Sequence, residues 1–98
     1  MNEHMIAEIR ICEEVPEMKE NGISSGYMPH HKFAHCDYLV SGAHIYEDDE
    51  IHYPGETLIA KISFLSWEHF GGSVNVGDEF TVMELNRIVA KGKVIELL

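Results

Sequence analysis

The chain has 98 residues, 45% of them hydrophobic, and its 17 acidic and 7 basic residues give a formal net charge of -10 with histidines neutral. This length predicts one domain over residues 1–98, because a split would leave neither half with a core. The acidic charge disfavours nucleic acid as a partner, since phosphate binding depends on lysine and arginine. Residues 1–5 lack the basic start and long apolar run of a leader, and no run approaches a membrane span. We therefore expect a cytoplasmic protein that does not bind membranes.

The N-terminal segment predicts a strand followed by a long connection. Residues 5–12 alternate between apolar and polar positions, which is typical of a half-buried strand. Residues 13–25 are acidic and polar and have no sustained helical pattern, so we expect them to cross the surface. The alternate strand positions that would face the core are Met5, Ala7, Ile9 and Ile11.

Residues 25–33 predict a sharp corner that feeds a second strand. Gly26 can take a positive φ without steric cost, and Pro29 fixes its own φ while pushing Met28 towards an extended conformation. Tyr27 lies between these two constraints, so the corner would set the direction of its side chain.

The middle of the chain predicts three strands. Residues 31–35 can form the second strand and residues 38–46 the third, with Gly42 as a candidate bulge. An acidic run at 47–50 and a Pro-Gly turn then precede the fourth strand at 57–66.

The C-terminal third predicts a closing hairpin. A glycine-rich break precedes a fifth strand at 80–84, and a turn at 85–87 leads into the sixth strand at 88–97. Ala90 and Gly92 would leave room for a tightly curved neighbour. Six short strands without a convincing helix predict an all-β barrel or sandwich, and closure would protect the sheet edges.

Three segments occur in a familiar order: 25–29 (SGYMP), 53–56 (YPGE) and 80–94 (FTVMELNRIVAKGKV). They resemble the corner, turn and closing hairpin of the third, C-terminal domain of elongation factor Tu. The resemblance covers about residues 5–98 and implies a six-stranded antiparallel Greek-key β-barrel. It also implies a link to translation components.

Two features of this chain differ from what nucleotide hydrolysis and tRNA binding require in that family. The family hydrolyses nucleotide on a separate domain with a P-loop, and the present sequence has no such motif. Met28 stands where the family has a phosphate-pairing arginine, whereas Arg87 matches the arginine of the closing hairpin. We therefore expect neither nucleotide hydrolysis nor the family's grip on tRNA.

The histidine and cysteine residues allow two interpretations, a metal site or ordinary surface histidines and free thiols. Imidazole and thiolate suit zinc, so His31, His35 and Cys36 are candidate metal ligands, although the spacing also fits histidines at the barrel surface and rim. Cys12 and Cys36 lack a CxxC spacing. This predicts two reduced thiols, with a bridge between the first and second strands as the alternative.

No catalytic set emerges from the sequence. Cys36 with His31 or His35 is the only nucleophile and base that we can assemble, and neighbouring strand residues point to opposite faces. The acidic run at 47–50 lacks the spacing of a calcium loop and instead suits contact with a basic protein. We therefore predict a protein without enzymatic activity and without a cofactor.

The leading functional hypothesis is a stand-alone, non-catalytic barrel that binds another protein. One alternative is an RNA-binding accessory of translation, which a contiguous face of Lys19, Lys32, Lys61, Arg87, Lys91 and Lys93 would favour. The other alternative is a small metal-binding protein. The residues predicted to contact a partner are Tyr27, Met28, His30, Trp67 and Arg87.

Overall fold

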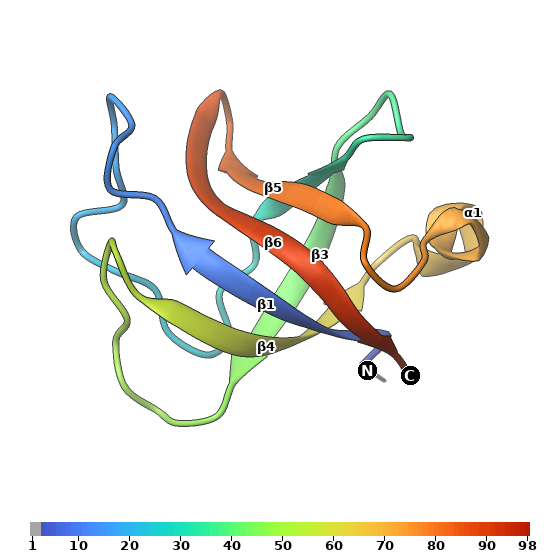
Figure 1. Cartoon of the computed structure of the whole chain (residues 1–98), viewed down its shortest axis with the longest axis horizontal. Helices are drawn as coiled ribbons and strands as arrows, with labels where there is room; N and C mark the ends of the chain where they lie inside the picture. The colour runs from blue at the N-terminus through green and yellow to red at the C-terminus, as the bar shows by residue number, and fades with distance from the viewer. Residues whose placement is uncertain (1–2) are drawn as a thin grey trace.

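A computed structural model describes residues 3–98 and shows a closed antiparallel β-barrel (Figure 1). Around the barrel the strands follow the order β1-β4-β3-β2-β5-β6. Strands β2, β3 and β4 are neighbours in chain order. Strand β1 pairs with β4, and the long 12–29 connection leads from β1 across to β2, which is a Greek-key arrangement. The predicted six-stranded Greek-key barrel is confirmed. The strands are β1 (Met5–Ile11), β2 (His30–Phe33), β3 (Val40–Tyr46), β4 (Thr57–Phe64), β5 (Glu79–Glu84) and β6 (Arg87–Leu97).

The predicted alternation of the first strand is confirmed, because its four inward residues have no exposed surface. The second strand is shorter than predicted: β2 ends at Phe33, and the chain turns so that the Cys36 amide donates to the Phe33 carbonyl at 3.2 Å. The predicted bulge at Gly42 is wrong. Gly42 pairs with Phe64 in regular register, and the register shifts lie between Ile6 and Ala7 and between Val82 and Met83.

The expectation of no helix is also wrong. A four-residue helix, α1 (Trp67–Phe70), and a 3-10 turn, η1 (Gly71–Ser73), link β4 to β5. Phe70 is buried against Phe33 and Phe64, with ring centroids 5.7 and 5.2 Å away. The helix therefore closes one end of the barrel with an aromatic side chain.

The core depends on two glycines that let rings approach the backbone. A Cβ at Gly92 would lie 2.3 Å from Cζ of Phe80, and a Cβ at Gly42 would lie 2.9 Å from Cε1 of His31. Both distances are too short for a real contact. The room that the sequence predicted beside Gly92 is thus filled by the Phe80 ring.

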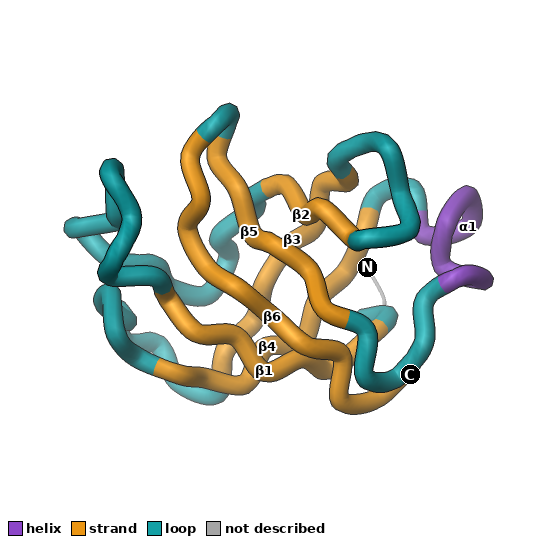
Figure 2. Tube along the Cα trace, turned by 45° about the horizontal axis from the view of Figure 1, so that its top comes forward, coloured by secondary structure: helices purple, strands orange, loops and turns teal. Residues whose placement is uncertain are grey.

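The barrel has two different ends. The end that we call the terminal end carries α1 and the C-terminus (Figure 2), and the Leu98 amide donates there to the His4 carbonyl at 3.0 Å. The loop end carries the β1–β2 connection (12–29), the β3–β4 connection (47–56) and the β5–β6 turn (85–86). In the described chain no helix is long and apolar enough to cross a membrane.

Candidate functional site

The loop end brings the two acidic segments of the sequence side by side. Ile23 and His52 exchange backbone hydrogen bonds of 2.8 Å in both directions, which joins the 12–29 and 47–56 connections. The Gly55 amide also donates to the Ile11 carbonyl at 2.8 Å, where β1 ends. Four carboxylates from one connection and five from the other therefore share one end of the barrel: Glu13, Glu14, Glu17, Glu20, Glu47, Asp48, Asp49, Glu50 and Glu56.

The predicted corner holds the 12–29 connection against β3. Gly26 has a φ of 100°, and its amide donates to the His44 carbonyl at 2.8 Å. The His44 amide in turn donates to the Tyr27 carbonyl at 2.8 Å, and Ser25 Oγ accepts from the Tyr46 amide at 2.8 Å. These bonds direct the Tyr27 side chain towards the end of β5.

Glu84, at the end of β5, collects three donors. It accepts hydrogen bonds from the Tyr27 hydroxyl and from Arg87, and its Oε2 lies 2.8 Å from Lys19 Nζ. Partial burial opposes ionisation, but the bonds from Lys19, Tyr27 and Arg87 outweigh it and lower the pKa of Glu84 to about 2. Burial, reinforced by the bond to Glu84, raises the pKa of the Tyr27 hydroxyl. This cluster ties the corner to the closing hairpin.

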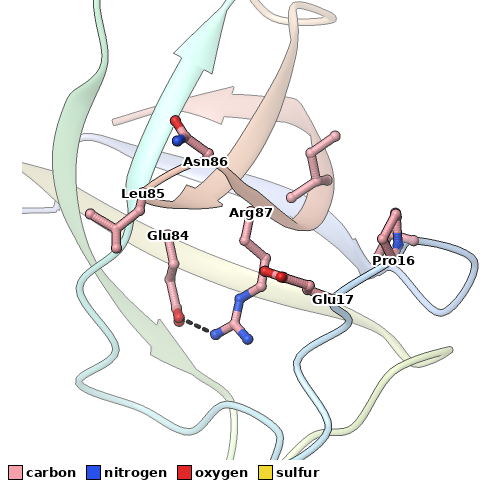
Figure 3. A pocket seen from close by; sticks show the side chains of 8 residues that line it. Pro16, Glu17, Glu84, Leu85, Asn86 and Arg87 are labelled. Carbon is pink, nitrogen blue, oxygen red and sulfur yellow. Dashed lines mark hydrogen bonds and ion pairs between the residues drawn. The ribbon is translucent and has the colours of Figure 1, made fainter.

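A groove of about 650 Å³ lies beside this cluster, between the 12–29 connection and the β5–β6 hairpin (Figure 3). Its apolar lining comes from both sides, and Glu17 and Arg87 lie at its polar edge. The lining residues are Val15, Pro16, Glu17, Glu84, Leu85, Asn86, Arg87 and Ile88.

Leu85 stands out at the tip of the hairpin. Its side chain is 82% exposed, and its φ of 55° makes it the one non-glycine residue with positive φ in the described chain. This region of backbone space suits glycine or asparagine and strains a bulky side chain. An apolar residue is therefore held in solvent at a position where its backbone conformation is unfavourable.

The structure brings together only some of the predicted contact residues. Tyr27 and Arg87 meet through Glu84. Met28 is 55% exposed next to the corner, and His30 pairs with Met83 across β2 and β5. Trp67 lies at the terminal end, where its ring stacks on His4 with centroids 5.0 Å apart.

The predicted metal ligands His31, His35 and Cys36 do not assemble. His31 is fully buried in the barrel, whereas His35 is exposed in the turn after β2. Among residues 3–98, no group of three or more His, Cys, Asp or Glu side chains is arranged to hold a metal ion. Cys12 and Cys36 are both free thiols, as the sequence predicted, and the alternative bridge is not formed.

His31 instead belongs to a polar chain inside the barrel. Its Nδ1 lies 3.0 Å from the Val40 carbonyl, its Nε2 lies 2.7 Å from His44 Nε2, and His44 Nδ1 lies 2.8 Å from the Tyr46 hydroxyl. Because a carbonyl only accepts, His31 donates from Nδ1, accepts from His44 at Nε2, and leaves His44 Nδ1 to accept from Tyr46. Burial lowers the pKa of His31 to about 4 and also lowers the pKa of His44.

His52 holds the second acidic connection together. Its Nε2 lies 2.9 Å from Asp48 Oδ1, and its Nδ1 lies 3.1 Å from Glu56 Oε1. The hydrogen bond to Glu56, followed by that to Asp48, raises the pKa of His52. The imidazolium form satisfies both carboxylates at once, since only that form donates from both nitrogens.

Sequence reasoning missed the residues that form the groove, above all Glu84 and Leu85. The sequence pattern predicts Glu84 only as the end of the fifth strand. Leu85 carried a usable signal, because a leucine at the centre of a tight hairpin turn stands where glycine, asparagine or aspartate is usual.

The chain matches no protein-family model, and no curated protein matches its sequence.

Proposed function

We propose that this chain is a non-catalytic protein-interaction module whose binding face is the loop end of the barrel. The observation that carries the proposal is Leu85, an exposed apolar side chain held at positive φ on the rim of an apolar groove. Backbone strain of this kind is typically retained where it serves a contact. The Glu84 cluster gives the groove a stable wall, which lowers the cost of ordering on binding.

The resemblance of segments 25–29, 53–56 and 80–94 to the third domain of elongation factor Tu supports a translation component as the partner. The order β1-β4-β3-β2-β5-β6 is compatible with that resemblance. The proposal assigns the groove a role that needs no nucleotide and no metal.

The arrangement of cations does not favour the RNA alternative. Lys19 and Arg87 are both occupied by Glu84, and Lys93 stands between Glu8 and Glu79 on the neighbouring strands. Lys32 donates to the carbonyls of the turn that follows β2. Four of the six candidate cations are therefore engaged by, or stand next to, other polar groups, which does not favour one continuous basic face.

The test is affinity capture from a lysate of the producing cells with three baits. The baits are the unaltered protein, Leu85→Asn at the groove, and Ile95→Asn, which alters a similarly apolar exposed residue on the outer face of β6. We expect the same proteins to be recovered with the unaltered protein and Ile95→Asn and to be lost with Leu85→Asn. Equal recovery with all three baits would place the binding face elsewhere.

A nuclease arm separates the protein partner from the RNA alternative. Recovery should survive ribonuclease treatment of the lysate. If ribonucleoprotein alone is recovered and ribonuclease abolishes it, the protein-interaction proposal fails and the RNA-binding accessory replaces it.

A further inference from the structure

The loop end has a strong excess of negative charge that its own cations do not balance. Most of its cations are already engaged: Arg10 lies 3.1 Å from Glu13, and Lys19 and Arg87 share Glu84. Lys91, which lines a hollow with Glu13 and Glu14, is a cation of this end that forms no ion pair in the described chain. His52 is engaged by Asp48 and Glu56. Among the residues that the structure describes, the carboxylates of this end that form no ion pair are Glu14, Glu17, Glu20, Glu47, Asp49 and Glu50.

These unpaired carboxylates border apolar surface on both sides of the 12–29 connection. Glu17 lines the groove on the side of the 12–29 connection, and Leu85 lines it on the side of the β5–β6 hairpin (Figure 3). On the other side, a second hollow of about 600 Å³ is lined by Glu14, Glu20, Tyr53 and Pro54 together with Glu13 and Met18. An occupant that suits both hollows must combine apolar groups with positive charge.

Resting on the proposed function, we propose that the loop end binds a lysine- and arginine-rich segment of a partner protein. An apolar side chain of that segment occupies the groove beside Leu85, and its cations lie along the carboxylates of the 12–29 and 47–56 connections. Complementary charge of this kind raises the association rate and excludes acidic partners. The same field repels RNA, because a polyanion would face carboxylates that have no counter-charge.

A direct binding assay with defined peptides tests the inference. The probe is a fluorescein-labelled 12-residue peptide of alternating lysine, arginine and leucine, and two comparison peptides replace either all cations by glutamate or all leucines by serine. We expect binding of the first peptide to exceed that of each comparison peptide by about tenfold or more. Raising sodium chloride from about 50 to about 300 mM should weaken it by about tenfold.

Matched charge variants show whether the binding is local. The triple variant Glu14→Gln, Glu17→Gln, Glu20→Gln neutralises the loop end. The control Glu68→Gln, Glu79→Gln, Glu96→Gln removes the same charge from exposed residues elsewhere. We expect the first variant to weaken peptide binding by about tenfold and the control by less than about twofold. Equal loss in both would indicate non-specific attraction to an acidic protein and would overturn the inference.

The experiments distinguish a failure of this inference from a failure of the proposed function. If the cellular partner is captured through Leu85 but its binding is insensitive to salt and to the loop-end triple variant, the binding module stands and the basic partner is wrong. If the peptide binds with full charge dependence but Leu85→Asn changes neither peptide binding nor cellular capture, the groove is not the contact and both proposals fail.

Discussion

At the scale of single residues, the least expected feature is the Tyr46–His44–His31 chain in the core. Each ring nitrogen has one partner, so the neutral tautomers are determined by the carbonyl of Val40 at one end. A proton added to His31 would turn its Nε2 into a donor that faces the Nε2 donor of His44, and a proton added to His44 would place a charge in the buried chain. Stability should therefore depend on both rings remaining neutral.

This dependence predicts that acid weakens the fold before its carboxylates titrate. The pKa of His31 is about 4 in the barrel, against an ordinary 6.5, so the unfolded chain binds more protons between these values. Stability is therefore lost as pH falls from about 6.5 towards 4. Between pH 7 and pH 5, we expect His31 alone to reduce the free energy of unfolding by about 2 kcal/mol, as measured by urea titration.

The variant His52→Gln is the control for this pH series. The pKa of His52 is raised by Glu56 and Asp48, so its contribution has the opposite sign and is lost as pH rises above its folded value. Removing it should leave the acid-induced loss intact or make it steeper. If the free energy of unfolding stays constant from pH 7 to pH 5 in both the unaltered protein and His52→Gln, the prediction that His31 and His44 must remain neutral is wrong.

A second residue-scale prediction concerns Leu85. Leu85→Asn should raise the free energy of unfolding by about 0.5–1 kcal/mol, because asparagine tolerates positive φ better than leucine and the lost side chain is 82% exposed. Urea titration provides the measurement, with Leu65→Asn, another exposed leucine, as the control. Destabilisation by Leu85→Asn would mean that the leucine contributes packing to the fold.

At the scale of elements, the sequence predicted most where side chains alternate and least where geometry depends on distant partners. The alternation of apolar and polar residues between Met5 and Ile11 correctly predicts which side chains of β1 face the core. In contrast, α1 has only four residues, too few for a helical period to be visible, and it is held by Phe70 in the core. The early end of β2 was also beyond the sequence pattern, because His35 continues the alternation while the backbone has already turned.

The candidate site was only half predictable for the same reason. Tyr27 and Arg87 could be singled out by their local motifs, but Glu84, which joins them, is separated from Tyr27 by 57 residues in the chain. Its role depends on the pairing of β2 with β5, which no local pattern specifies. The grouping of the two acidic connections depends likewise on the Greek-key path of the chain.

The close approach of β5 and β6 gives a prediction at this scale. Gly92→Ala would place a Cβ 2.3 Å from the Phe80 ring, so we expect it to lower the free energy of unfolding by about 1–3 kcal/mol. The control is Gly72→Ala, since an added Cβ there meets nothing within 4 Å. Thermal or urea unfolding of both variants measures the difference, and equal stability would show that the Phe80 ring moves freely aside.

At the scale of the whole molecule, closure depends on contacts between distant parts of the chain. Strand β1 pairs with both β4 and β6, and Met5 faces Leu97 across the last of these pairings. Among the strands that the structure describes in residues 3–98, the closed barrel therefore leaves no free edge that could pair with another copy. It also cannot close until the C-terminal strand is in place.

This topology predicts slow folding. Barrels dominated by non-local pairs typically fold in milliseconds to seconds. Trp67 is a suitable reporter because its ring stacks on His4, which is distant from it in the chain. We expect its fluorescence to change on that timescale after stopped-flow dilution from urea, and a complete change within microseconds would contradict closure as the slow step.

The contact between His4 and Leu98 has a practical consequence for engineering. His4 and Leu98 are hydrogen-bonded neighbours at the end of the barrel away from the groove. A linker, fluorophore or solid support attached at Leu98 would thus leave the acidic loop end of the barrel exposed to solvent. The same proximity allows a short peptide to join His4 to Leu98 and the chain to be opened in an exposed turn. The barrel can in this way be mounted or permuted as an oriented scaffold.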